Sequence, residues 1–548
     1  MIVARRVAAT LRELGITRVY GLPGEDHMTL LDAFAREGIT YHAAVNESSA
    51  VIMAATEAQT SGRPGVVVLS LAPGISNGVN GLAHAALEFS PVLVISGNFP
   101  AHREPFVVRQ WLDLRRLVEP YVKWSGRISE KTDVVLAVCK ALDIASAQQP
   151  GPVFLEIPDE VAKADESDLV DSSHAIGVLA QQWAARGPSR LHGSSPTTQM
   201  ATSLARTLTE ARRPVLVVGG RRDDVSPETL REFATRFRVP VFTSSGQKGL
   251  AQSSNNDFYA GTWLNGSLEA SIVSRADALI LVNPEGYDHY NKPWPYEVRT
   301  TAITPAAFVE WLYPFDERIV ADPEAALRGV LDDVAEGASE WTAADVTDYR
   351  SHLRAALLPA ATAELTVPHA VDAALRSAPV GTAITADAGF SKPIVAMLSE
   401  PDERGGYFAS NGLSTMGYSI PAAIAVARTG RPTLAFMGDG SLLMRATELI
   451  YAHTSLEAPL VILAIMDRSL SQIEIKQERL GLDTVGVTVP QVSCEQLAAS
   501  VGAVGADVDD LASLERALAE AWSRSGPTLI GAHLDPASSR EFFEVLRG

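Results

Sequence analysis

The chain has 548 residues, of which 46% are hydrophobic and 20% are charged. This composition is typical of a globular protein with three or four domains of about 150 residues each. The net charge of -19, with no basic patch in the sequence, disfavours nucleic acid or an anionic membrane surface as a partner. The only two cysteines, Cys139 and Cys494, give neither a disulfide framework nor the spacing of a metal site.

The first residues, MIVARRVAATLRELGI, have an amphipathic pattern, which predicts a helix rather than a signal peptide. No apolar run is long enough to span a bilayer. We therefore expect the protein to be cytoplasmic.

Apolar runs alternate with amphipathic helical segments along the chain, a pattern typical of parallel sheets covered on both faces. The six clearest predicted strands are residues 65–70, 91–97, 214–220, 278–284, 433–440 and 459–467. Two polar stretches, 167–195 and 333–356, are the predicted linkers. The sequence thus predicts the α/β class with three doubly wound parallel-sheet domains, at residues 1–165, 190–335 and 357–548.

Two aspartates, Asp439 and Asp467, follow two of these predicted strands directly. Carboxyl ends of parallel strands are where such sheets bind ligands, and the glycines beside Asp439 allow backbone to approach a phosphate closely. Magnesium takes about six oxygens and is usually held by one or two carboxylates together with substrate phosphates. The pair therefore suggests a magnesium site, with capping of the following helices as the open alternative.

Here the chain resembles the thiamine diphosphate enzymes of the acetolactate synthase, pyruvate decarboxylase and benzoylformate decarboxylase superfamily. Gly438-Asp439-Gly440 matches the first half of their diphosphate signature, which ends in Asn-Asn after a helix and a strand. This chain has Met466-Asp467 instead, so the resemblance implies metal ligands from Asp439, Asp467 and the carbonyl of Ser469. An aspartate still ligates magnesium, but it adds negative charge beside a diphosphate.

The N-terminal third carries the other half of the resemblance, in residues 21–34 and 43–67. The family places its catalytic carboxylate in the second stretch, where this chain has Glu47. In the family this carboxylic acid binds N1' of the aminopyrimidine, and such a group works best with a pKa raised toward neutrality by an apolar site. A capping role at the helix start is the alternative.

Further matching segments are residues 69–85, 109–113, 148–158, 384–390 and 410–427. In the last of these, Met416 takes the place of the family's apolar side chain that wedges between the two cofactor rings. The resemblance implies these cofactor-binding residues: Pro23, Glu47, Asn77, Asp387, Ala388, Gly389, Leu413, Ser414, Met416, Gly438, Asp439, Gly440, Ser441, Asp467, Ser469 and Leu470.

The resemblance also implies a pyrimidine-binding, a central and a diphosphate-binding domain. It implies a homodimer or dimer of dimers (a homotetramer), with Glu47 of one subunit facing Asp439 and Met416 of the partner subunit. The central domain lacks the family's flavin-gripping pattern at residues 278–297, so FAD binding is less favoured there than a structural role.

The reaction is inferred from departures from the family. Simple decarboxylases carry histidines and a glutamate where this chain has Ser70, Leu71 and Ile473, whereas Gln110 matches acetolactate synthases. These features favour decarboxylation of a 2-oxo acid followed by carboligation, with Glu47, Gln110 and His27 as candidate catalytic residues. A simple decarboxylase releasing an aldehyde, and a non-catalytic cofactor-binding homologue, remain the alternatives, and His27 is open to the interpretation of an exposed loop residue.

Overall fold

The computed structural model of the chain describes residues 1–100, 102–129, 134–147, 149–165, 198–220, 224–264, 266–284, 296–305, 315–359, 365–403, 405–535 and 542. These residues contain three six-stranded sheets in which every strand pair is parallel. The α/β class with three doubly wound sheets is therefore confirmed. The first predicted linker, 167–195, lies outside the described residues, and the predicted domain boundaries stay a prediction.

The chain divides into two compact units. Unit 1 comprises Met1–Leu191, Gly412–Thr429 and Arg445–Ser455. Unit 2 comprises His192–Asn411, Gly430–Met444 and Leu456–Gly548. Two short pieces of the C-terminal third thus belong to the unit that the N-terminal third forms.

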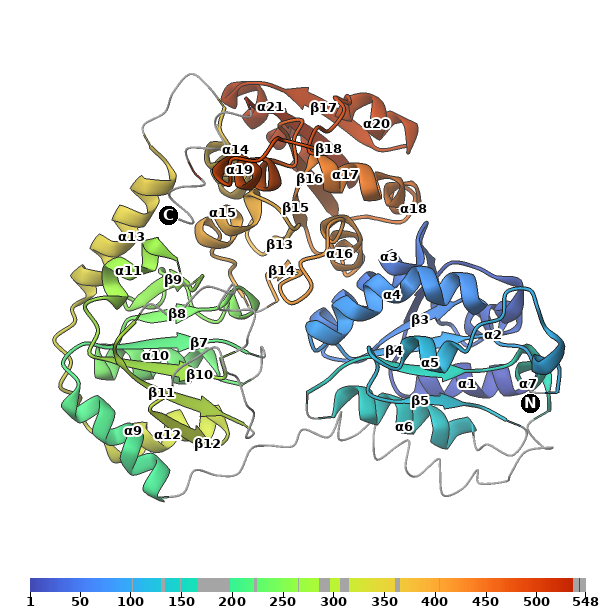
Figure 1. Cartoon of the computed structure of the whole chain (residues 1–548), viewed down its shortest axis with the longest axis horizontal. Helices are drawn as coiled ribbons and strands as arrows, with labels where there is room; N and C mark the ends of the chain where they lie inside the picture. Colours follow the sequence, from blue (N-terminus) through green and yellow to red (C-terminus); the bar gives the residue numbers. More distant parts are fainter. Residues whose placement is uncertain are drawn as a thin grey trace. The chain divides into compact units, whose positions relative to one another are not determined.

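The sheet of unit 1 has the strand order β2-β1-β3-β4-β6-β5. Its strands are β1 (Arg18–Gly21), β2 (Thr40–Ala43), β3 (Gly65–Leu69), β4 (Val92–Ser96), β5 (Ser125–Arg127) and β6 (Val153–Glu156). Its helices are α1 (Val3–Glu13), α2 (Met28–Arg36), α3 (Glu47–Ser61), α4 (Leu71–Leu87), α5 (Leu114–Val118), α6 (Val134–Ser146), α7 (Asp159–Lys163), α16 (Ser419–Ala427) and α18 (Leu449–Ala452). Figure 1 shows α3 and α4 on one side of this sheet and α1 and α6 on the other.

Helix α3 is buried on nearly all sides, since 12 of its 15 residues are buried. It packs against both α4 and α16. The contact with α4 is close because α4 offers glycine there: a Cβ at Gly81 would come within 2.7 Å of the Ser48 carbonyl oxygen. The helix starts at the cap residue Asn46, whose side chain accepts a hydrogen bond from Ser48 N, and stops at Gly62, where φ is +68°.

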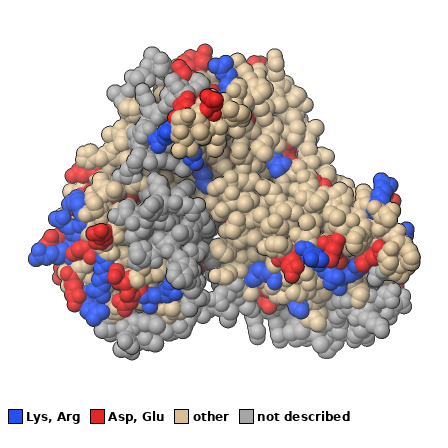
Figure 2. Space-filling model, in the orientation of Figure 1, with Lys and Arg blue, Asp and Glu red and all other residues tan. Residues whose placement is uncertain are grey.

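The central sheet, in unit 2, has the order β12-β11-β10-β7-β8-β9. Its strands are β7 (Pro214–Val218), β8 (Val241–Thr243), β9 (Tyr259–Thr262), β10 (Ala278–Val282), β11 (Arg299–Thr304) and β12 (Glu317–Val320). Its helices are α9 (Thr198–Glu210), α10 (Pro227–Phe237), α11 (Ser267–Val273), α12 (Pro323–Asp333) and α13 (Ala343–Leu357). Helices α10 and α12 each carry an ion pair between side chains one helical turn apart, Arg236–Glu232 in α10 and Arg328–Glu324 in α12. Figure 2 shows acidic and basic side chains intermingled at the lower left of the face it draws.

The third sheet, also in unit 2, has the order β14-β13-β15-β16-β18-β17. Its strands are β13 (Ala383–Ala386), β14 (Tyr407–Ala409), β15 (Thr433–Gly438), β16 (Pro459–Met466), β17 (Val504–Val508) and β18 (Gly526–His533). Its helices are α14 (Val367–Ser377), α15 (Ser391–Leu398), α17 (Asp439–Arg445), α19 (Ser471–Arg479), α20 (Cys494–Ser500) and α21 (Leu511–Trp522). Because β13, β15 and β16 are neighbours, residues that follow them meet at one edge of the sheet. None of the described helices has the length and apolar character needed to cross a bilayer.

A buried lysine lies in unit 2, beside the central sheet. Lys248 is 3% exposed, and its Nζ donates to Thr262 Oγ1 at 2.6 Å and lies 5.9 Å from the centre of the Tyr407 ring. Burial lowers the pKa of Lys248 to about 7, which the Glu400 charge opposes. In the unfolded chain the Lys248 amine is protonated at any pH below its usual pKa. Burial in the folded protein disfavours that protonated form.

We expect Lys248→Met to raise the free energy of unfolding by about 1–3 kcal/mol near pH 7, because it removes the cost of a buried amine. A lowered pKa means that the unfolded state binds more protons between pH 7 and about 10, so the wild type gains stability as pH rises through that window. The difference in free energy of unfolding between Lys248→Met and the wild type should therefore become smaller as pH rises. Urea unfolding at pH 7, 8.5 and 10 measures it, with the exposed Lys140→Met as control; a constant difference would contradict the prediction.

Candidate functional site

The first group of predicted site residues gathers at the start of α3, in unit 1. Glu47 is the first residue of α3 and is 8% exposed. Asn77, from α4, donates from Nδ2 to Glu47 Oε2. Gly74, one turn earlier in α4, lies beside the other oxygen: a Cβ there would be in ordinary van der Waals contact with Glu47 Oε1, at 3.6 Å. The two helices thus present a buried carboxylate with one oxygen bound and the other beside a glycine.

The loop that carries Leu413, Ser414 and Met416 runs along α4 in the same unit. Gly412 N donates to Glu88 Oε1 at 2.6 Å, Thr415 Oγ1 donates to Asn80 Oδ1 at 2.9 Å, and the Tyr418 ring lies 4.8 Å from the His84 ring. Asn80, His84 and Glu88 are spaced four residues apart, so they share one face of the helix. Because Asn77 is also on α4, one helix holds both Glu47 and the loop of Met416.

The loop after β1 places Pro23 and His27 at the carboxyl edge of the first sheet. His27 is 1% exposed, its Nε2 accepts from Gly24 N at 3.0 Å, and its Nδ1 lies 3.4 Å from Asp26 Oδ1. Asp26 in turn accepts from Ser70 Oγ and from Leu71 N, at the start of α4. The interpretation of His27 as an exposed loop residue was therefore wrong, because the ring is buried and its Nε2 binds the backbone of the same loop.

Gln110 lies in a different environment, on an exposed segment after β4. It has a left-handed φ of +57°, and its neighbours Phe106, Val108 and Trp111 are 83%, 99% and 44% exposed. Among the described residues, the carboxylate of Glu47 has its hydrogen bond with Asn77 and none with Gln110. Its predicted catalytic role stays a prediction.

The second group of predicted site residues meets at the carboxyl edge of the third sheet, in unit 2. Asp387 follows β13, Asp439 follows β15 and Asp467 follows β16, and all three are at most 6% exposed. Asp387 Oδ1 accepts from Ser441 Oγ at 2.8 Å. Ala388 and Gly389 continue the chain after Asp387, and Gly389 has a φ of +142°. The meeting of Asp439 and Asp467 is what adjacent parallel strands predict.

Asp439 is held by backbone on two sides. Its Oδ1 accepts from Gly440 N and its Oδ2 from Arg468 N, each at 2.7 Å. Arg468 has a left-handed φ of +59°, rare for a non-glycine residue, and this turn directs its N–H at Asp439. Asp439 therefore does more than cap α17, because it also receives a hydrogen bond from the loop after β16.

Asp467 bonds within its own loop. Ser471 Oγ donates to Asp467 Oδ2, and Ser469 N donates to Asp467 Oδ1 at 3.3 Å. The loop is pinned in turn by Leu470 N to Val487 O at 2.8 Å and by Val489 N to Arg468 O at 2.9 Å. Ser471 begins α19, so Asp467 also has the helix-start contacts that the capping alternative predicts.

The carboxylates of Asp439 and Asp467 repel each other when both are ionised, so a cation bound between them would be stabilising. Burial, followed by the charge of Asp467, raises the pKa of Asp439 to about 6. Burial likewise raises the pKa of Asp467 above its usual value. Within the described part of the chain no three or more His, Cys, Asp or Glu side chains form a metal cluster, so further ligands would come from backbone carbonyls and from a bound phosphate.

At the carboxyl end of β7 in the central sheet, the backbone lies close to a side chain that follows β10. A Cβ at Gly220, just after β7, would lie 2.1 Å from Asn283 Nδ2, which itself donates to Asp224. Residues 285–295, where the sequence departs from the flavin-binding pattern, lie outside the described residues. The weaker prediction of FAD binding stays a prediction.

Several contacts of these sites were not foreseen from the sequence. They include Asp26 with Ser70, Ser441 with Asp387, and Glu448 with the backbone before Glu47. The partners are far apart along the chain, and no motif marks them. Only the adjacency of the strands could have hinted at the pairing of Ser441 with Asp387.

Comparison with known proteins matches three family models along the chain. Residues 1–115 match the thiamine pyrophosphate enzyme N-terminal TPP binding domain, 201–330 the central domain, and 387–532 the C-terminal TPP binding domain. The fold and these matches define a three-domain α/β enzyme that binds thiamine diphosphate.

Similar proteins include two named enzymes along nearly the full length. A probable 2-ketoarginine decarboxylase of Pseudomonas aeruginosa is 27% identical, covering 95% of this chain and 92% of the relative. An acetolactate synthase of Bacillus subtilis is 24% identical, covering 97% and 93%. The chain belongs to the thiamine diphosphate-dependent enzymes of the acetolactate synthase and decarboxylase superfamily, as a lyase or transferase.

A solved structure supports the fold. The Rhodococcus jostii RHA1 thiamine diphosphate-dependent 4-hydroxybenzoylformate decarboxylase superposes with a TM-score of 0.81 at 20% identity, covering 98% of this chain and 99% of that chain. At this identity the likeness supports the fold alone.

Proposed function

We propose that the protein is a thiamine diphosphate- and Mg²⁺-dependent enzyme that decarboxylates a 2-oxo acid and joins the remaining fragment to a second carbonyl compound. The observation that carries the proposal is the buried Glu47 at the start of α3, with Oε2 bound by Asn77 and Oε1 beside Gly74. Thiamine diphosphate, when bound, would supply a thiazolium ring as the electron sink for decarboxylation of the 2-oxo acid.

The residues of the chain have the following proposed roles. Glu47 holds a proton at Oε1 for the aminopyrimidine ring, while Asn77 fixes the carboxyl group by its bond to Oε2. Met416 supports the cofactor from the loop on α4. Asp439, Asp467 and the Ser469 carbonyl hold Mg²⁺, which neutralises the pair of buried carboxylates.

His27 and Gln110 have weaker claims to catalysis. The ring nitrogens of His27 contact Gly24 and Asp26, a geometry that supports positioning of the loop after β1. Gln110 lies on a segment with exposed apolar side chains, which we propose to be covered in a homodimer or dimer of dimers. In that assembly Gln110 would contact substrate.

A simple decarboxylase is the second candidate. It is favoured by the 27% identity to a relative described as a probable 2-ketoarginine decarboxylase. In that case the aldehyde is released rather than transferred, and the residues proposed above for cofactor binding are the same.

One experiment separates these functions. The protein, saturated with thiamine diphosphate and Mg²⁺, is given a panel of 2-oxo acids that includes guanidino and aryl side chains, with and without an aldehyde or a second 2-oxo acid as acceptor. Released carbon dioxide and products are quantified by NMR. A hydroxyketone matching the carbon dioxide supports carboligation, an equivalent amount of aldehyde supports the simple decarboxylase, and cofactor binding without carbon dioxide release supports the non-catalytic homologue.

We expect Asp467→Asn to weaken Mg²⁺ binding when cofactor is scarce, while thiamine diphosphate affinity at saturating Mg²⁺ stays equal or improves. Unit charges about 4 Å apart interact by roughly 4 kcal/mol at an effective dielectric near 20, so attraction to the cation and repulsion of the diphosphate are both appreciable. Cofactor dissociation constants at several Mg²⁺ concentrations should give curves that cross between the two proteins.

The control for this substitution is Ser471→Ala, which removes the hydroxyl that donates to Asp467 and keeps the Asp467 carboxylate. If Asp467 only caps α19, both variants should lower thermal stability slightly and give cofactor curves parallel to those of the wild type.

A further inference from the structure

The short segment after α17 belongs to unit 1 and carries a buried acid. The 3-10 helix η6 (Ala446–Glu448) ends on Glu448, whose side chain is 1% exposed. Burial raises the pKa of Glu448, and its hydrogen bonds oppose that rise. A buried carboxylate is costly unless strong partners offset its desolvation, so its partners show what holds it there.

Glu448 binds the two backbone N–H groups directly before Glu47, and Ser49 and Arg445 also act on its carboxylate. Oε2 accepts from Val45 N at 2.9 Å, and Oε1 accepts from Asn46 N at 3.0 Å. Both oxygens of one carboxylate therefore bind two consecutive peptide groups. Such a bidentate contact fixes the direction of the chain as well as its position.

A second contact from the same segment holds the other side of Glu47. Arg445 Nη2 donates to Ser48 Oγ at 2.5 Å, and Ser48 Oγ donates to the cap residue Asn46. Arg445 is fitted closely, because a Cβ at Gly417 would lie 2.6 Å from its Cγ. Residues on both sides of Glu47 are thus bound by side chains three residues apart.

We propose that Glu448, together with Arg445, is a positioning residue that sets the direction of the Glu47 side chain. The inference rests on the proposed function, in which Glu47 acts on the cofactor. The first residue of a helix takes its orientation from the backbone before it, and that backbone is bound at Val45 and Asn46.

Ordinary capping does not account for the contact. The side chain of Asn46 already caps α3 by accepting from Ser48 N. The N–H of Val45 precedes the helix and is not among the donors that helix formation leaves free. The carboxylate therefore fixes the approach to the helix, where a small rotation would move Glu47.

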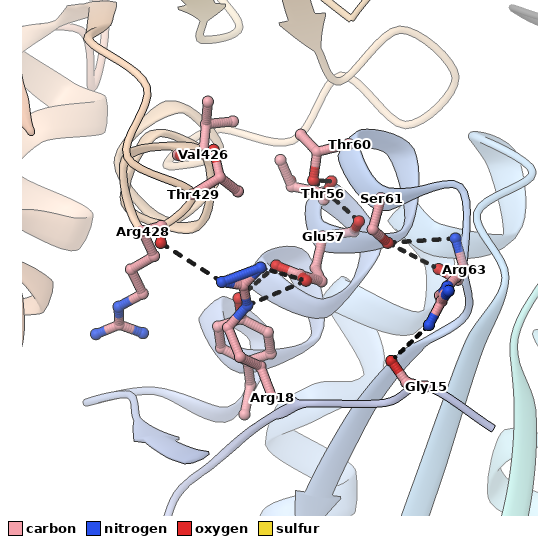
Figure 3. Close-up of polar contacts among 11 residues, drawn as sticks. Gly15, Arg18, Thr56, Glu57, Thr60, Ser61, Arg63, Val426, Arg428 and Thr429 are labelled. Atoms are coloured by element: carbon pink, nitrogen blue, oxygen red, sulfur yellow. Dashed lines mark hydrogen bonds and ion pairs between the residues drawn. The ribbon is translucent and has the colours of Figure 1, made fainter. Parts of the chain in front are cut away.

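The test compares Glu448→Gln with a control on the same helix. A glutamine has one acceptor oxygen and an NH₂ group, so one of the two backbone N–H groups would face a donor. The control is Glu57→Gln: Glu57 lies near the other end of α3, is 9% exposed, and bonds Arg18 Nε and Tyr20 Oη at 3.1 Å each. Figure 3 shows Arg18 reaching Glu57 and the carbonyl of Arg428. Both variants lose a buried carboxylate contact, but only one of these contacts adjoins Glu47.

Four measurements are made on each full-length protein: the thiamine diphosphate dissociation constant, kcat and KM for a 2-oxo acid that the wild type turns over, the near-ultraviolet circular dichroism of the bound aminopyrimidine, and amide hydrogen exchange of the apoprotein over residues 43–50. For Glu448→Gln we expect kcat about 10- to 100-fold lower, the scale of a small misplacement of a catalytic group. We expect KM and the dissociation constant within about threefold, a weaker dichroism band and faster exchange at Val45 and Asn46. Glu448→Asp, which keeps both acceptors, should recover part of the rate.

Glu57→Gln should leave kcat and the dichroism band as in the wild type, even where it lowers thermal stability. The inference is overturned if Glu448→Gln keeps the wild-type kcat and band, or if Glu57→Gln reduces both equally. If the wild type binds no thiamine diphosphate, the proposed function fails instead. Unchanged exchange at Val45 and Asn46 in the apoprotein of Glu448→Gln would then overturn the positioning role by itself.

Discussion

Glu47→Gln lowers turnover of a 2-oxo acid by about two to four orders of magnitude, while the thiamine diphosphate dissociation constant stays within a few-fold. The reason is that an amide keeps the shape of the side chain but cannot hold and release a proton, and loss of a general acid costs on this scale. The expected result is a fall in kcat with little change in KM. Steady-state rates of carbon dioxide release, together with cofactor titration, measure both quantities.

The control for Glu47→Gln is Asn77→Ala, which removes the hydrogen bond to Oε2 and leaves the carboxyl group. It should lower kcat less than Glu47→Gln does. A Glu47→Gln protein that keeps half of the wild-type turnover would refute the assignment of Glu47 as the proton-holding group.

Asp439→Ala should abolish retention of thiamine diphosphate in the presence of Mg²⁺. The substitution removes one of two carboxylates proposed to hold the cation, and without the cation two negative groups, Asp467 and the diphosphate, would face each other. The apoprotein should keep its fold, because relief from burying a carboxylate whose pKa is raised to about 6 offsets the lost bonds to Gly440 and Arg468. Gel filtration followed by assay of bound cofactor measures retention.

A control for the two backbone hydrogen bonds is Asp277→Ala, at an exposed position directly before β10 of the central sheet. Asp277 also accepts two backbone hydrogen bonds, from Arg212 N and Arg213 N at 2.8 Å each, so its loss removes the same number of contacts away from the third sheet. This variant should retain cofactor. Holoprotein of Asp439→Ala that survives gel filtration unchanged would show that the metal is bound elsewhere.

The sequence predicts where the two aspartates of the third sheet lie, because their positions follow from the order of the strands. Asp439 and Asp467 each follow an apolar run, and neighbouring parallel strands place such residues at one edge. What the sequence does not predict is how each loop turns after its strand. The left-handed Arg468, whose N–H reaches Asp439, follows from pairing of its loop with Val487 and Val489, which no local pattern signals.

The sequence predicts less about the surroundings of Glu47 in unit 1, because contacts between residues far apart in sequence determine them. The resemblance identifies Glu47, but Glu448 binds the backbone before it across 402 and 403 residues of sequence. An acid at the end of a helical turn has many uses, so its type alone carries no information about that contact. His27 shows the same limit in reverse: its loop has the composition of an exposed turn, and the structure buries the ring against Gly24 and Asp26.

Unit 1 is formed by segments far apart in sequence, which affects how it folds during translation. Helix α3 is buried on nearly all sides, yet α16, which packs against it, begins only at Ser419. A ribosome therefore releases α3 long before it has translated one of the helices that cover it. During that interval the apolar surface of α3 is open to aggregation, the hazard that molecular chaperones counter in slowly completed proteins. Chains truncated before residue 412 should accordingly accumulate as insoluble material or be degraded, even though they contain the whole first sheet.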